Sequence, residues 1–126
     1  MTGKKGWNAR MLEWLIGKKR ENIVPKVSTT IEPDEVQELL AKNEKIVILD
    51  VRQQHEYRSG HIKGAQHIPL MELNKRIHEL RKDSTIVTVC HSGRRSAQAA
   101  KLLQREGFTV RNMVGGMMRW RGKVVR

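Results

Sequence analysis

Two short runs of apolar and β-branched residues, Ile46–Leu49 and Thr85–Val89, constrain the fold of this 126-residue chain most strongly. A continuous apolar run of this length is typical of a strand that is buried on both faces of a parallel sheet. Segments with a helical spacing of apolar residues lie between the two runs and after the second. This alternation predicts an α/β fold, with a mostly parallel central sheet that helices flank on both faces.

Local signals place further elements along the chain. Pro33 suits the first turn of a helix, where its missing N–H leaves no bond unmade, and Val36 and Leu39 supply an apolar face. Gly107 suits the position just beyond a helix end, with Phe108 packing behind it. The predicted strands cover 27–30, 46–49, 85–89 and 109–113; the predicted helices begin at Glu32–Pro33, cover 70–80, follow Cys90, and start again at Gly115–Gly116 to include Trp120.

Cys90, the only cysteine in the chain, directly follows the second apolar run. A glycine-containing turn and an Ala-rich helical segment come next, so the thiol lies between a strand end and a helix start. Backbone N–H groups at a helix start favour an anion, so we expect a lowered pKa and a reactive thiolate. The alternative is a small buried apolar residue. Asp50 directly follows the first apolar run, and sites of parallel sheets form at this carboxyl edge.

Four sequence elements resemble those of rhodanese-like domains, and they occur in the same order. The most specific is the loop Cys90-His91-Ser92-Gly93-Arg94-Arg95, which matches the pattern Cys-x-x-Gly-x-Arg. The others are Leu49-Asp50-Val51-Arg52, the segment from Glu56 to Pro69 with Gly60-His61-Ile62 and Gly64-Ala65, and Gly115-Gly116-Met117 with Trp120. The resemblance covers about residues 27–122, and it divides the chain into an N-terminal extension, 1–26, and a rhodanese-like domain, 27–126.

The resemblance implies a single-domain sulfurtransferase of the thiosulfate:cyanide type. In such proteins, the loop cysteine takes a sulfane sulfur from a small anionic donor such as thiosulfate, becomes a persulfide, and passes the sulfur to cyanide, a thiol or another protein. By position, Cys90 is the nucleophile, and backbone N–H groups hold the persulfide and the donor; the loop that supplies them comprises His91, Ser92, Gly93, Arg94 and Arg95. The two arginines add positive charge that can attract the donor.

The length of the loop separates two chemistries. Related folds that bind phosphate or arsenate have five residues between the cysteine and the arginine, whereas four residues separate Cys90 from Arg95. The smaller loop suits a sulfur atom better than a tetrahedral oxyanion. A phosphatase-like or arsenate-reductase-like enzyme is therefore the weaker interpretation.

Asp50, Arg52 and Glu56 are expected to support the loops around Cys90, chiefly through ion pairs. Asp50 could instead be a general acid or base, although sulfur transfer from thiosulfate needs neither. His91 could lower the pKa of Cys90 when protonated, or it could simply face the solvent. The five histidines are scattered without the spacing of metal ligands, so we expect no metal, and the implied chemistry needs no cofactor.

Residues 1–26 combine positive charge with a periodic apolar pattern. Trp7, Met11, Trp14 and Leu15 share one face of a predicted helix, and basic residues flank them. Such a basic amphipathic segment could lie in a membrane interface, bind a partner, dock on the domain or stay unstructured. The net charge of +12 favours anionic substrates and partners, but the few aromatic residues form no stacking pattern for nucleic acid.

The remaining expectations concern location and turnover. No run approaches the length of a membrane-spanning helix and no secretory signal is recognisable, so we expect a cytoplasmic protein, in peripheral contact with a membrane at most. A single cysteine excludes an internal disulfide and fits a reducing compartment. We expect a monomer. Two interpretations without turnover stay open: a persulfide relay to a specific protein, and a regulatory binding module that retains the loop incidentally.

Overall fold

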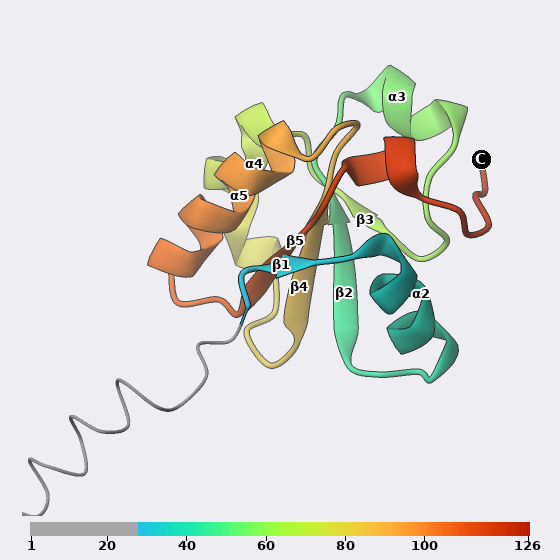
Figure 1. Cartoon of the computed structure of the whole chain (residues 1–126). Helices are drawn as coiled ribbons and strands as arrows, with labels where there is room; N and C mark the ends of the chain where they lie inside the picture. Colours follow the sequence, from blue (N-terminus) through green and yellow to red (C-terminus); the bar gives the residue numbers. More distant parts are fainter. Residues whose placement is uncertain (1–27) are drawn as a thin grey trace, which may run out of the picture.

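A computed structural model describes residues 28–126, which fold around one five-stranded sheet (Figure 1). The strand order is β1-β5-β4-β2-β3, and every neighbouring pair is parallel. The strands are β1 (Thr30–Ile31), β2 (Ile46–Asp50), β3 (Gln66–His67), β4 (Thr85–Val89) and β5 (Val110–Met113). The helices are α2 (Pro33–Ala41), α3 (Gln54–Ser59), α4 (Leu70–Arg76) and α5 (Arg94–Arg105), with the 3-10 helices η1 (Ile77–Glu79) and η2 (Gly116–Arg119).

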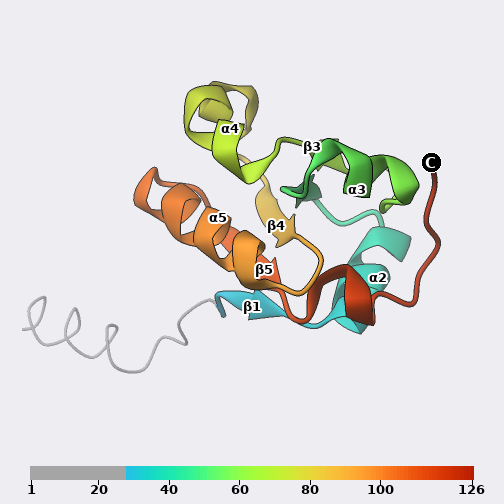
Figure 2. The same cartoon turned by 90° about the horizontal axis from the view of Figure 1, so that it is seen from above.

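Helices cover both faces of the sheet, as the sequence predicts (Figure 2). The first face lies under α4 and α5, and the second lies under α2 and η2. Successive side chains of a strand point to opposite faces, so each central strand supplies both cores. In β2, Leu49 joins the first core and Ile48 joins the second. In β4, Ile86 and Val87 divide in the same way, which explains why both runs are continuously apolar.

Most predicted elements are present, with adjusted ends. Helix α2 begins at Pro33, as predicted, and the helix after Cys90 ends at Arg105. Gly107 has a φ of +92°, and the amide of Phe108 bonds to the carbonyl of Leu103 at 3.0 Å, so the predicted cap is confirmed. Of the strand predicted over 27–30, residues 28 and 29 precede β1, which covers Thr30–Ile31, and residue 27 lies outside the described residues.

Three local predictions differ from the structure. The segment between β2 and α4 contains a short helix, α3, and a two-residue strand, β3, where the sequence predicts no helix or strand. The helix predicted over 70–80 becomes a 3-10 helix from Ile77. The last predicted helix is the single 3-10 turn η2, which ends before Trp120. Gly115 precedes this turn and Gly116 begins it, and both have a left-handed φ.

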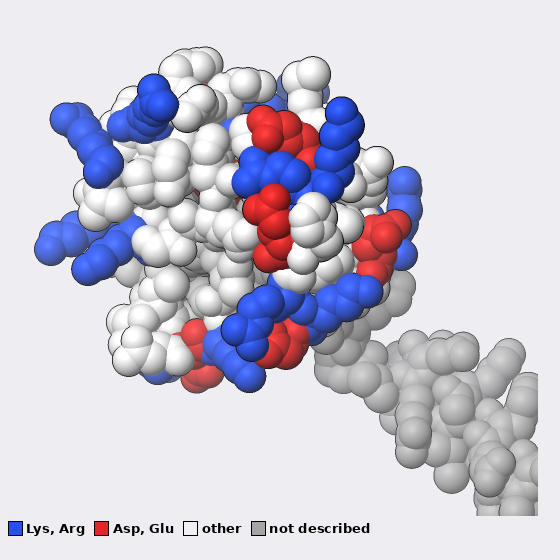
Figure 3. Space-filling model, turned by 180° about the vertical axis from the view of Figure 1, so that it is seen from behind, with Lys and Arg blue, Asp and Glu red and all other residues white. Residues whose placement is uncertain are grey.

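Basic and acidic side chains are unevenly mixed on the face of the domain that Figure 3 shows. Figure 3 shows basic side chains spread over the back of the domain, with acidic side chains set among them on one part of this face. Elsewhere on the described domain, ion pairs join Arg111 to Glu35 and Arg119 to Glu32, both at 3.2 Å. Within residues 28–126, every helix is too short or too polar to cross a membrane. The predicted amphipathic extension, 1–26, lies outside the described residues.

Candidate active site

Cys90 lies at the carboxyl edge of the sheet, directly after the central strand β4. It is fully buried, and the loop that follows it runs over its side chain into helix α5. Gly93 forms the N-cap of α5 with a φ of +100°, a left-handed conformation that glycine adopts without strain. The predicted position of the thiol, between a strand end and a helix start, is therefore confirmed.

Two hydrogen-bond donors contact the sulfur of Cys90. The backbone N–H of Gly93 donates to Sγ at 3.0 Å, and the hydroxyl of Ser96 donates to Sγ at 3.3 Å. Burial acts to raise the pKa of the thiol, but hydrogen bonds from Ser96, Gly93 and the Ser92 amide outweigh it, so the pKa is lowered. The direction of this shift is the one that the sequence predicts.

Ser96 is a site residue that the sequence analysis missed. Its side chain is completely buried and lies in the first turn of α5, with its hydroxyl aimed at the sulfur. A signal was present in the sequence, because a serine in the first turn of a helix faces the same anion as the helix N-terminus. The motif Cys-x-x-Gly-x-Arg ends at Arg95, one residue before Ser96.

Arg95 binds Glu56 on helix α3 rather than facing the sulfur directly. The two side chains form a bidentate pair, with N–O distances of 2.7 and 2.9 Å, and both are partly buried. The hydrogen bond from Arg95 is the main reason why the pKa of Glu56 is lowered to about 2. This pair ties α3 to the cysteine loop, whereas Arg94, His91 and Ser92 are exposed.

Asp50 and Arg52 form a second pair, which is almost completely buried. Arg52 donates to Asp50 through Nε and Nη2, the shortest contact being 2.8 Å, and also through its backbone N–H. The Nη2 of Arg52 also donates to the carbonyl of Gly60 at 2.8 Å. The carboxylate of Asp50 is thus engaged by an arginine, as the supporting role predicts, and the pair joins the end of β2 to the next loop.

The histidines near this edge are engaged in packing. His61 and His67 stack on opposite sides of Tyr57, with ring centroids 3.7 and 4.3 Å from that of the tyrosine. A ring nitrogen of each also contacts a backbone carbonyl, that of Tyr57 or of Arg52. Across residues 28–126, we find no group of three or more His, Cys, Asp or Glu side chains that is arranged to bind a metal.

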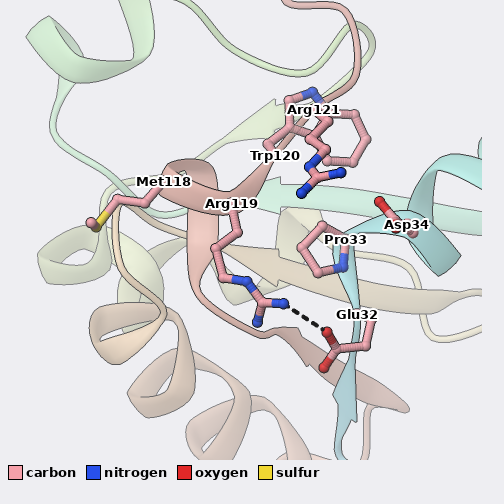
Figure 4. Close-up of a pocket in the computed structure, with 7 residues that line it drawn as sticks. All are labelled: Glu32, Pro33, Asp34, Met118, Arg119, Trp120 and Arg121. Carbon is pink, nitrogen blue, oxygen red and sulfur yellow. Dashed lines mark hydrogen bonds and ion pairs between the residues drawn. The ribbon is translucent and has the colours of Figure 1, made fainter.

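A cavity of about 270 Å³ lies beside the cysteine loop, between the start of α2 and η2 (Figure 4). The ion pair of Arg119 and Glu32 forms one wall, and Trp120 and Arg121 lie across from Pro33. None of the residues that line the cavity belongs to the cysteine loop. Helix η2 connects the two, because it lines the cavity through Met118 and Arg119 and bonds to the loop through the amides of Met117 and Met118.

Comparison with known proteins matches this site and fold to one family. The family model of the rhodanese-like domain matches residues 32–123. A Bacillus subtilis (strain 168) protein, YrkF, provisionally named a sulfur carrier protein, is 49% identical over 82 residues, which are 64% of this chain and only 44% of YrkF. The chain thus spans less than half the length of that relative. The thiosulfate sulfurtransferase GlpE of Pseudomonas fluorescens (strain SBW25) is 34% identical over 72% of this chain and 83% of its own.

A solved structure agrees with these relatives. The crystal structure of a rhodanese-like domain protein from Staphylococcus aureus superposes with a TM-score of 0.71 at 30% identity, covering 75% of this chain and 92% of that one. The chain belongs to the rhodanese-like domain family.

Proposed function

We propose that this protein is a sulfurtransferase in which Cys90 carries a sulfane sulfur as a persulfide. The observation that carries the proposal is the pair of donors, Gly93 N–H and Ser96 O–H, on the sulfur of a buried cysteine at a helix start. Such donors stabilise a thiolate, which is the nucleophile in attack on an S–S bond, and they equally stabilise the anionic persulfide that results. Relatives that are named sulfurtransferases support the same general reaction.

The proposed reaction has two balanced steps, with thiosulfate as the donor. In the first, the Cys90 thiolate attacks the outer sulfur of thiosulfate, a new S–S bond forms, the original S–S bond breaks, and sulfite leaves with its electron pair. In the second, a nucleophile such as cyanide or a thiol attacks the outer sulfur of the persulfide. The bond to Cys90 then breaks, and the thiolate returns. No external oxidant, reductant or cofactor enters either step.

The other loop residues receive supporting roles in this proposal. The amides of residues 91–95 hold the sulfur and the donor, and exposed Arg94 supplies the positive charge that attracts an anion. The Arg95–Glu56 and Asp50–Arg52 pairs keep the loops on either side of Cys90 in place. Because Asp50 is held by Arg52, it acts as support and not as a general acid or base.

A persulfide relay to a protein acceptor is the second candidate. The complete burial of Cys90 favours it, because a protein partner that binds over the loop has more binding energy with which to open it than a small donor has. The name of YrkF as a sulfur carrier points the same way. We place either reaction in a monomeric, cytoplasmic protein, with the extension 1–26 available for contact with a partner or an anionic membrane surface.

Measurement of thiocyanate formation tests the catalytic role of Cys90. The purified full chain, and its Cys90→Ala variant, would be given thiosulfate and cyanide while thiocyanate is measured. We expect thiocyanate from the wild-type chain and none above background from Cys90→Ala. Equal rates for the two proteins would refute the catalytic role of Cys90.

Intact mass spectrometry distinguishes a relay from an enzyme. After exposure to the donor, the wild-type chain should gain the mass of one sulfur atom, and a reductant should remove it. A relay would show this gain together with slow thiocyanate formation. A chain that never gains sulfur from thiosulfate or from a persulfide donor would contradict both candidates.

A further inference from the structure

Strand β5 and helix η2 hold backbone carbonyls of the cysteine loop by hydrogen bonds. These two elements received no role in the site from the sequence analysis. In a trans peptide, the C=O of one residue and the N–H of the next point in opposite directions. The amides of Met117 and Met118 bond to the carbonyls of Cys90 and His91, at 2.8 and 3.0 Å. Since these carbonyls are fixed toward η2, the next N–H groups, including that of Ser92, are directed away from η2.

Asn112, on β5, holds a third backbone carbonyl of the loop, that of Gly93. Its Nδ2 donates to the carbonyl of Gly93 at 3.0 Å. Its Oδ1 accepts a hydrogen bond from the hydroxyl of Thr88 at 3.3 Å, and Thr88 is fully buried in β4, two residues before Cys90. Both ends of the Asn112 amide are therefore engaged, which fixes the direction in which its NH₂ group points.

Gly93 is the residue of the loop that most needs such support. Its N–H donates to the sulfur of Cys90. Its φ is +100°, and glycine, which has no Cβ, can adopt many other φ values at little energetic cost. Its carbonyl also accepts the first backbone bond of α5, from Ala97 at 3.2 Å. A side chain that holds this carbonyl limits rotation of the peptide units on both sides of Gly93.

We propose that Asn112 is a positioning residue, which keeps the Gly93 peptide oriented so that the loop amides stay aimed at the sulfur of Cys90 and at the atom added to it. Asn112 acts through Gly93 and not on the sulfur itself. The competing explanation is that Asn112 only fastens β5 to the loop, in which case its loss would lower stability and leave the properties of the thiol unchanged. The inference deepens the proposed function and rests on it, but its test needs no sulfur donor.

The test compares Asn112→Ala with a matched control, Gln104→Ala, in the full chain. Gln104 also donates a side-chain amide to a backbone carbonyl, that of Val110 at 3.3 Å, but at the far end of β5. The rate of alkylation by iodoacetamide would be followed against pH, and Cys90 is the only thiol that can report. The midpoint of this profile gives the pKa of Cys90, whereas the plateau reports access to the buried sulfur.

We expect Asn112→Ala to raise the midpoint by about half a unit to one unit, the change that corresponds to the loss of one hydrogen bond. At a pH below the midpoint, alkylation then slows roughly threefold to tenfold. Thr88→Val, which keeps Asn112 but frees its Oδ1, should shift the midpoint in the same direction by less. Gln104→Ala should leave it unchanged.

Two results would overturn the inference: the same midpoint in Asn112→Ala and the wild-type chain, or an equal shift in Gln104→Ala. If Asn112→Ala fails to fold, Thr88→Val decides, and an unchanged midpoint there counts against the inference. Because alkylation involves no sulfur transfer, a shifted midpoint would stand even if the chain formed no thiocyanate. The two proposals can therefore fail separately.

Discussion

Arg94 and Arg95 are neighbours in the cysteine loop, yet they meet different surroundings. Arg95 is held by Glu56, which lies 39 residues earlier in the chain, whereas Arg94 is exposed. Glu56 compensates the charge of Arg95, so the positive charge available to the proposed anionic donor comes mainly from Arg94 and from the loop amides. The sequence identifies both arginines but not this division, because the partner of Arg95 is brought to it only by the fold.

Replacing Glu56 with Gln should make the stability of the protein less dependent on acid pH. The folded-state pKa of Glu56, about 2, lies below its ordinary value of 4.5. The stabilisation by this pair is therefore present above pH 4.5, and it is lost as the pH falls toward 2. At neutral pH, the loss should be about 1 kcal/mol, because solvent partly screens the pair. Urea unfolding of both proteins at a series of pH values measures it.

The expected pattern is a difference in stability that is largest at neutral pH, shrinks as the pH falls toward 2, and vanishes below pH 2. Glu38→Gln serves as the control, since Glu38 is an exposed carboxylate of α2. It should change stability little at any pH. A difference between wild type and Glu56→Gln that stays constant over the whole range would contradict the assignment of this pKa.

At the scale of secondary structure, a helix or strand was predictable from the sequence when its own residues carry the pattern of burial, and not when it depends on a partner element. Strands β2 and β4 were predictable because burial on both faces demands apolar runs. Helix α3 has no buried residue, and β3 exists only through its pairing with β2, so neither leaves a periodic pattern. The same holds within the site, where Ser96 and Asn112 acquire their roles from neighbours that are remote in sequence.

Helix η2 depends on contacts with the cysteine loop, which is remote from it in sequence, and the variant Gly116→Ala tests these contacts. Gly116 has a φ of +61°, and a Cβ there would overlap the backbone carbonyls of Cys90 and His91. The substitution should push η2 off the loop and break the bonds from Met117 and Met118. We expect a loss of about 3 kcal/mol, from overlap and from left-handed strain together, and slower alkylation of Cys90.

The matched control is Gly64→Ala. Gly64 has a φ of +83°, but a Cβ there would meet no atom within 4 Å. This variant should therefore lose only the strain term, about 1 kcal/mol, and keep the alkylation profile of the wild-type chain. Chemical denaturation and alkylation measure both. Similar losses in the two variants would show that η2 does not shape the loop.

In the whole molecule, the buried Asp50–Arg52 pair joins the sheet to the rim of the site, by which we mean the segment of Gly60 and His61. Arg52 reaches from Asp50, at the end of β2, to the carbonyl of Gly60. The next residue, His61, forms a two-way backbone bridge with Val125 near the chain end, at 2.9 and 2.8 Å. One buried arginine thus helps to fix the rim against which the C-terminal segment packs.

Replacing Asp50 with Ala should destabilise the fold by about 3 kcal/mol or more, because it leaves the guanidinium of Arg52 buried without a counter-charge. The exposed pair Arg81–Asp83, at 2.6 Å, provides the control. Asp83→Ala removes a carboxylate from an equally short contact in solvent and should leave the unfolding midpoint almost unchanged. A loss in Asp50→Ala no larger than that in Asp83→Ala would show that the buried pair is dispensable.

The residues that hold the cysteine loop follow Cys90 in the chain, and this order has a consequence for synthesis on the ribosome. Cys90 emerges before Asn112, Met117 and Met118, which hold the carbonyls of its loop. Strand β4 likewise gains its partner β5 only when that later segment has left the exit tunnel. A nascent chain should therefore carry an ordinary thiol, and the sulfur chemistry proposed for Cys90 should begin only when the fold around it is complete.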